Sequence, residues 1–189
     1  IENWNEINPD QRLSLLEKLV NLDNLMDYVT AQVFLANTDW PINNVRKWRP
    51  RHANGKWQWI PYDLDGILGV LNQSPAENTF RDKVLSFTHV HRPVFIEIIQ
   101  KILAEEKGRQ RFTHRFTTHM QTTLSEERIL RAIDSKQTVL MPEMARHIDR
   151  WRMNPIAPEN EKIEEEWSMP IGSIDEWLAE VQKLRNYAM

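Results

Sequence analysis

Apolar positions recur every three or four residues along most of the chain, as in helices that bury one face. The first such run follows Asn8-Pro9, a typical helix start. The second follows Asp23, which we expect to cap a helix of about 13 residues that stops at Asn37. Pro41 prevents that helix from continuing. The N-terminal third therefore predicts two helices and then a change of structure.

The middle of the chain has a different pattern, of short runs rich in tryptophan. Residues 45–49 and 56–62 fit two short strands, and Asn54-Gly55 between them is typical of a tight reversal. This part of the chain therefore predicts a β-hairpin. Residues 71–88 show no periodicity and are expected to form a loop.

Helical periodicity returns in the second half. Pro93 is expected to open a helix that ends near Gly108. A long helix is expected to start at Ser125, and Pro142 to kink or restart it. These residues predict that the second half contributes helices only.

The C-terminal part predicts one more helix. Ser173 and Glu176 fit a capping box at its start. The preceding residues 154–170 contain prolines and an acidic run, and they are expected to be a solvated loop. The whole pattern predicts a mainly α-helical fold with one small β-hairpin, organised as a single domain over residues 1–189.

Composition narrows the class of protein. With 41% hydrophobic and 27% charged residues, large-scale disorder is not expected. A net charge of −3 argues against a nucleic-acid partner, which would require a basic face. No apolar run approaches the roughly 20 residues of a membrane span, and the lack of cysteine excludes disulfides and thiolate metal sites. Because the chain begins with Ile1, we expect it to be a piece of a longer protein.

Oxygen-bearing side chains flank the predicted hairpin on both sides. Asp39 and Asn44 precede it, and Asp63 and Asp65 follow it. Because a hairpin returns the chain on itself, its two ends lie side by side. We therefore expect Asp39, Asn44 and Asp63 to converge, with Asp65 as a further candidate.

Such a set of groups suits phosphoryl transfer from ATP. One carboxylate accepts the proton of the attacking hydroxyl, and a second carboxylate with an amide oxygen holds Mg²⁺. The kinase pattern H-R-D-x-x-x-x-N separates Asp from Asn by five positions, and the metal-binding Asp follows a strand. Asp39 and Asn44 are also five positions apart, and Asp63 follows the second predicted strand.

The same residues also fit a purely structural interpretation, and the histidines offer a different metal site. Asn and Asp before Pro are common in capped turns, and Asp63 and Asp65 could form a solvated strand end. The six histidines include His89 and His91, which could chelate a metal, but no HExxH motif occurs. We interpret the histidines as surface or packing residues. For the Asp and Asn residues around the hairpin, spacing alone leaves open whether they form a structural turn or a catalytic site.

The order of the motifs adds a resemblance. N-T-D-W-P-x-N-N at 37–44 is followed by Trp48, then G-K-W-x-W at 55–59 and Y-D-L-D at 62–65. This order resembles the CotH kinase family of spore-coat proteins, and the helical tail at 142–151 is similar as well. The resemblance spans nearly the whole chain.

The resemblance implies roles for particular residues. Asp39 would be the catalytic-loop aspartate, Asn44 a metal ligand and Asp63 the counterpart of the metal-binding aspartate, with Asp65 as its rival. Trp40 is expected to pack under the loop. The implied activity is transfer of the ATP γ-phosphoryl group to Ser or Thr of a protein substrate, with Mg²⁺ or Mn²⁺. The implied setting is a spore coat, a cell surface or the secreted fraction.

The chain lacks the pattern of a complete kinase. No glycine-rich phosphate loop is present, and nothing before the second predicted helix suggests a β-rich lobe. We therefore expect a C-terminal, helical kinase-like lobe that is inactive without an N-terminal lobe. The alternatives are a non-catalytic pseudokinase or scaffold that binds a protein partner, and a carboxylate–metal phosphohydrolase.

Overall fold

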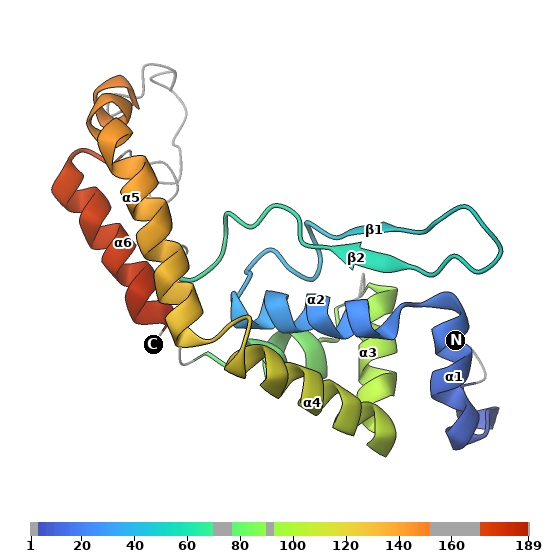
Figure 1. Cartoon of the computed structure of the whole chain (residues 1–189). Coiled ribbons are helices and arrows are strands. Elements are labelled where there is room, and N and C mark those ends of the chain that lie inside the picture. Colours follow the sequence, from blue (N-terminus) through green and yellow to red (C-terminus); the bar gives the residue numbers. More distant parts are fainter. Residues whose placement is uncertain (1–3, 70–76, 90–92, 152–170, 189) are drawn as a thin grey trace. The chain divides into compact units, whose positions relative to one another are not determined.

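The computed structural model describes residues 4–69, 77–89, 93–151 and 171–188 (Figure 1). These residues are mainly helical and contain a two-stranded antiparallel hairpin, which confirms the expected fold class. They form two compact units, Ile1–Leu124 and Ser125–Met189. Organisation as a single domain stays a prediction, and the expected loop at 154–170 lies outside the described residues.

The elements of the first unit are the 3-10 helix η1 (Trp4–Glu6), α1 (Pro9–Leu19), α2 (Leu22–Phe34), β1 (Arg46–Trp48), β2 (Gln58–Ile60), the π-helix η2 (Arg81–Leu85), α3 (Val94–Ala104) and α4 (Glu106–Gln121). The second unit contains α5 (Glu126–Trp151) and α6 (Ile174–Ala188). In the hairpin, Lys47 of β1 lies opposite Trp59 of β2. None of the described helices is long and apolar enough to cross a membrane.

The start of α1 was predicted correctly, but that of α2 was not. Asn8 caps α1 by accepting a hydrogen bond from the Asp10 amide at 3.0 Å. The cap of α2 is Asn21, which accepts from the Asn24 amide at 3.2 Å, so the assignment of Asp23 as the cap was wrong. Asp23 lies inside the first turn and pairs with Arg111 instead.

Of two helix boundaries expected from single residues, one lies four residues earlier than placed and the other is absent. α3 ends at Ala104, and Gly108 lies inside α4, where an added Cβ would come within 2.1 Å of the Ile102 carbonyl oxygen. Gly108 is therefore required by close approach of the backbone and does not end a helix. α5 continues through Pro142, so no restart takes place there.

The region between the hairpin and α3 is only partly a loop. Residues 77–88 include η2, so the expectation of an unstructured stretch was wrong for this part, while 71–76 lie outside the described residues. Val84 of η2 is 0% exposed, and the Gln100 side chain donates to its carbonyl at 2.7 Å. These contacts fix a turn whose residues carry no helical period.

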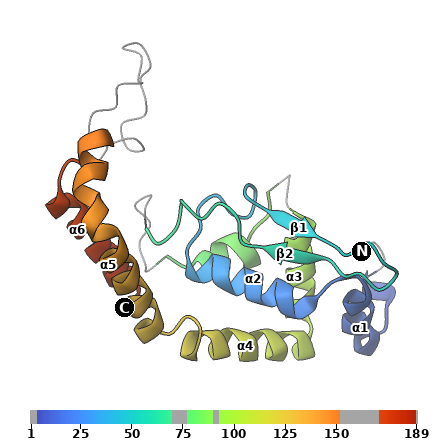
Figure 2. The ribbon, with the colours of Figure 1, turned by 45° about the horizontal axis from the view of Figure 1, so that its top comes forward.

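α2 is the central element of the first unit. The hairpin lies along one side of it and α4 along the other (Figures 1 and 2). Its side chains Leu25, Met26 and Val29 are fully buried, as are Trp40 and Ile99. Burial of this many apolar groups is the main source of stability for the unit.

Asn24 attaches the hairpin to α2. Its side-chain amide donates to the Trp59 carbonyl at 3.1 Å, and its side-chain oxygen accepts from the Trp59 amide at 2.6 Å. Both polar groups of one backbone residue in β2 are therefore satisfied by a single side chain. This attachment holds β2, and the segment that follows it, in a fixed position on α2.

A network of ion pairs attaches α4 to α1 and α2. Arg111 pairs with Glu17 and Asp23, and Arg115 and His119 both contact the carboxylate of Asp27. The distances to Asp27 are 2.6 Å from Arg115 Nη2 and 2.8 Å from His119 Nε2. Burial acts to raise the pKa of Asp27, but the hydrogen bonds from Arg115 and His119 outweigh it and lower that pKa.

This network should make the stability of the first unit depend on acid. Because the pKa of Asp27 is lower in the folded protein than in the unfolded chain, where it is about 4, the ionised carboxylate stabilises the fold above about pH 4. This stabilisation is lost as the pH falls through the pKa of the folded protein. Asp27→Asn should therefore destabilise the protein at pH 7, and the difference from wild type should shrink toward pH 3. Denaturant unfolding across this pH range measures both curves.

Glu6→Gln is the matched control, because Glu6 is an exposed carboxyl group of the same unit. It should leave the pH dependence unchanged. Parallel pH curves for wild type and Asp27→Asn would show that Asp27 does not contribute to acid sensitivity.

The second unit consists of α5 packed against α6. Its core contains Met144 and Ile148 of α5 and Trp177 and Val181 of α6. At the start of α6, Ser173 Oγ accepts from the Glu176 amide at 3.1 Å, as predicted. The Glu176 carboxylate reaches back to the Gly172 amide at 2.6 Å, one residue earlier than in a standard capping box.

Candidate active site

The loop between α2 and β1 brings Asp39 and Asn44 into contact. Asn44 Nδ2 donates a hydrogen bond to Asp39 Oδ2 at 3.1 Å. The Asn43 amide donates to the Asp39 carbonyl at 2.9 Å, so the loop turns once between these residues. Because the Asn44 nitrogen faces the carboxylate, its amide oxygen remains available to accept another group.

The loop is fixed from the α2 side by a buried amide pair. Asn37 is 1% exposed, and its Nδ2 donates to Gln32 Oε1 at 2.9 Å. The other end of the same side chain, Asn37 Oδ1, accepts from the Asp39 amide at 3.2 Å. Asn37 therefore connects the position of Asp39 to the rigid end of α2.

Trp40 fixes the loop through the core, as expected. Its side chain is 0% exposed, and its ring lies 5.8 Å from that of Phe95 and 6.3 Å from that of Tyr28. Burial raises the pKa of Tyr28 to about 12, against smaller opposing effects of the Trp40 and Gln32 side chains. Tyr28 thus stays protonated near neutral pH and supports the loop without acting as a base.

The other half of the site follows β2. The guanidinium of Arg46 lies 4.5 Å from the ring centre of Tyr62, which joins the two arms at the base of the hairpin. Just beyond these residues, Asn44 and Asp63 both adopt left-handed backbone conformations, with φ of 55° and 52°. Asp and Asn tolerate this region better than other residues with a Cβ. The pairing of β1 with β2 is therefore followed at the base of the hairpin by Asn44 and Asp63, where the chain turns away from the hairpin.

Backbone contacts then bring the two halves together. The Thr38 amide and hydroxyl both donate to the Gly66 carbonyl at 3.2 Å, and the Leu68 amide donates to the Leu35 carbonyl at 2.8 Å. The segment that carries Asp63 and Asp65 thus runs beside the loop that carries Asp39. Both carboxylates are exposed, and no hydrogen bond joins either to Asp39 or Asn44 among the described residues.

The oxygen groups fit a sparse divalent-cation site. Across residues 4–69, 77–89, 93–151 and 171–188, no three His, Asp or Glu side chains are grouped closely enough to hold a metal. Mg²⁺ does not need such a group, because it binds one or two carboxylates and keeps several waters. The Asn44 amide oxygen and the carboxylates of the 63–65 segment are ligand types that such a site uses. His91, one of the chelation candidates, lies outside the described residues.

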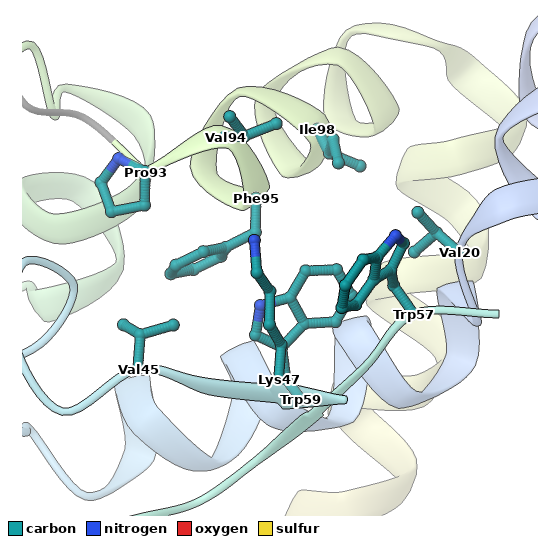
Figure 3. Close-up of a pocket in the computed structure, with 9 residues that line it drawn as sticks. All are labelled: Val20, Val45, Lys47, Trp57, Trp59, Pro93, Val94, Phe95 and Ile98. Carbon is teal, nitrogen blue, oxygen red and sulfur yellow. The ribbon is translucent and has the colours of Figure 1, made fainter. Parts of the chain in front are cut away.

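A pocket of about 290 Å³ lies between the hairpin and α3, and its lining includes Val45, the residue that follows Asn44 (Figure 3). Trp57 and Trp59 of the hairpin region face Val94, Phe95 and Ile98 of α3 across it (Figure 3). Lys47 Nζ lies 5.2 Å from the ring centre of Trp57 at its edge. The lining includes none of the candidate residues Asp39, Asn44, Asp63 and Asp65.

Sequence reasoning missed the residues that support the loop. Gln32 lies four residues after Tyr28 on the buried face of α2. Polar side chains at helical spacing on an apolar face are a signal that could have been noticed, because buried polar groups require partners.

Comparison with protein-family models matches residues 1–189, the whole chain, to the family described as CotH kinase protein. Searches of curated proteins and of solved structures found no match. The matched region includes both compact units and the entire candidate site.

Proposed function

The chain belongs to the CotH kinase protein family, and from this we propose that it transfers the γ-phosphoryl group of ATP to Ser or Thr hydroxyls of a protein substrate. The contact between Asp39 and Asn44 carries the proposal, because these residue types at this spacing form the catalytic loop of protein kinases. The chain would act as the helical C-terminal lobe, with a separate N-terminal lobe completing the nucleotide site.

Asp39 is the general base in this proposal. Asn44 holds one of its carboxylate oxygens, Oδ2, and leaves Oδ1 to accept the proton of the substrate hydroxyl. The buried Asn37–Gln32 pair fixes the backbone of Asp39 before substrate binds. Most of the catalysis in phosphoryl transfer comes from such positioning and from stabilisation of charge.

Asn44 and Asp63 would hold the divalent cation, either Mg²⁺ or Mn²⁺. The bound cation neutralises charge that develops on the phosphates. Asp63 is favoured over Asp65 because it comes first after β2, where its left-handed backbone turns the chain out of the hairpin. Backbone conformations of this kind are concentrated at functional sites, where the surrounding structure maintains them.

The test is transfer of radiolabel from ATP to protein by the full-length protein in the presence of Mg²⁺ or Mn²⁺. Asp63→Asn should raise the metal concentration needed for half-maximal transfer by about tenfold or more, because even outer-shell changes at metal sites cost that much. Asp65→Asn is the matched control and should shift it far less. A titration of transfer rate against metal concentration measures both.

A larger shift for Asp65→Asn would assign the metal to Asp65. Equal labelling by wild type and both variants would contradict the proposed site. Absence of transfer by a protein that carries both lobes would favour the alternative, a pseudokinase or scaffold that binds a protein partner through the same surface.

A further inference from the structure

Thr38 is the point at which three separate segments of the first unit meet. Its amide and hydroxyl donate to the Gly66 carbonyl in the segment after the hairpin, at 3.2 Å each. Its own carbonyl accepts a hydrogen bond from Lys83 Nζ at 3.0 Å, across 45 residues of sequence. The residue directly before Asp39 is thus attached to both the 63–66 segment and η2.

The peptide group between Thr38 and Asp39 is held at both of its polar ends. Its N–H, which belongs to Asp39, donates to Asn37 Oδ1 at 3.2 Å, and its C=O accepts from Lys83. A peptide group is planar, so two such contacts fix its orientation and the direction in which Asp39 leaves the backbone. With the hydrogen bond to Asn37 alone, the peptide group could still rotate about the direction of its N–H bond.

Lys83 reaches this peptide from a well-anchored turn. η2 contains the fully buried Val84, whose carbonyl is held by Gln100. Phe80, which precedes η2, stacks on Phe112 of α4 with ring centres 5.5 Å apart. π-helical turns are rare and occur frequently at functional sites, because their irregular hydrogen bonding must be maintained by surrounding contacts.

Lys83 forms no ion pair with its acidic neighbour Asp82, whose pKa is lowered mainly by the hydrogen bond from Arg81 and only slightly by the charge of Lys83. The neighbouring carboxylate, Asp82, is bonded to Arg81 at 2.7 Å. Lys83 is half-buried and makes no ion pair with any residue that the structure describes. A partly buried ammonium on a neutral carbonyl adds little to stability, yet a charged donor makes a stronger hydrogen bond than a neutral one.

We propose that Lys83 is a positioning residue for phosphoryl transfer, which holds the Thr38–Asp39 peptide so that the Asp39 carboxylate meets the substrate hydroxyl. This inference rests on the function proposed above. Lys83 acts through Asp39 and touches neither ATP nor substrate. Misplacement of a reacting group by about 1 Å can cost about 100-fold in rate, so loss of one such contact affects catalysis more than folding.

The test compares Lys83→Met, Lys83→Arg and Arg81→Met in the full-length protein. Lys83→Met should lower kcat by about 10- to 100-fold with little change in KM for ATP, and Lys83→Arg should restore most of the rate. Arg81→Met is the matched control: it removes a cation from the same turn, one that contacts only Asp82, and should leave kcat unchanged. If Lys83→Met is unstable, Lys83→Gln replaces it: its N–H donor is uncharged and makes a weaker hydrogen bond, so kcat should fall by less than in Lys83→Met, again with little change in KM for ATP.

Hydrogen exchange provides a second measurement that does not depend on activity. Lys83→Met should speed exchange of the Thr38 and Asp39 amides, while Arg81→Met should not. Unchanged exchange in Lys83→Met would overturn the inference, as would an unchanged kcat or an equal loss in Arg81→Met. A raised KM for ATP with unchanged kcat would instead indicate that Lys83 contacts the nucleotide directly. If wild type transfers no phosphate, the proposed function fails, and the exchange result still decides whether Lys83 holds the loop.

Discussion

Replacing Asp39 with Asn should lower kcat for phosphoryl transfer by about 100- to 10,000-fold while KM for ATP changes little. Asn has nearly the same shape and can still contact Asn44, but it cannot accept a proton from the substrate hydroxyl. The position is exposed, so folding should be unaffected. Initial rates at saturating and limiting ATP, with denaturant unfolding as a check on folding, measure the two effects separately.

Asp10→Asn is the matched control for this substitution. Asp10 is an exposed aspartate of the same unit whose carboxylate contacts Lys107 and lies outside the proposed site. Its variant should retain the wild-type rate. A rate for Asp39→Asn within about twofold of wild type would exclude Asp39 as the general base, since such catalysis contributes far more than that.

Replacing Trp40 with Ala should lower the free energy of unfolding by about 3–5 kcal/mol, the range measured for large aromatic side chains removed from protein cores. Trp40 is 0% exposed and contacts the rings of Tyr28 and Phe95. The substitution removes apolar burial and leaves a cavity beneath the loop. Denaturant unfolding followed by circular dichroism gives the change in free energy.

Trp48 of β1 provides a control of the same residue type. It is 45% exposed, so Trp48→Ala should change the free energy of unfolding by no more than about 1 kcal/mol. Trp40→Phe should recover part of the loss because an aromatic ring still fills most of the space. A loss for Trp40→Ala as small as that expected for Trp48→Ala would contradict the contribution of Trp40 to the core.

Local signals in the sequence predicted much of the fold. Asn8-Pro9 placed the start of α1 correctly because capping and proline geometry depend only on neighbouring residues. The hairpin followed from Asn54-Gly55 between two runs of strand-forming residues, although each strand is only three residues long. Of the residues expected to converge at the base of the hairpin, Asp39 and Asn44 are in contact, whereas no hydrogen bond joins Asp63 to either of them among the described residues.

The errors arose where tertiary contacts decide. Asp23 is a good cap by residue type, but Arg111 from α4 takes its carboxylate, and Asn21 caps the helix instead. Gly108 reads as a helix end, yet it is needed where α4 starts against the end of α3. η2 is held by Gln100 and Phe112 from other helices, so its own residues show no pattern from which it could be predicted.

The support of the site depends on long-range contacts as well. Lys83 is 45 positions from Thr38, and no local periodicity relates the two residues. Thr38 was part of a motif, but its contacts with Gly66 depend on the path of the chain after the hairpin. The motif therefore supplied the candidate site residues, whereas the residues that support the loop required the three-dimensional structure.

The hairpin is attached at its base and along β2, and just before β2 the Trp57 amide donates to the Leu19 carbonyl at 2.8 Å and the Trp57 carbonyl accepts from the Asn21 amide at 3.0 Å. Asn24 holds Trp59, and Arg46 contacts Tyr62 near Asn44 and Asp63, while the residues from Arg51 to Asn54 at the tip are exposed. Extra residues inserted at the tip would extend the ribbon outward, whereas a single insertion between Asn44 and Arg46 would reverse the alternation of side chains in β1. The tip is thus a natural place for length variation in evolution, and for a fluorescent label in the laboratory, because neither would separate Asn44 from Asp63.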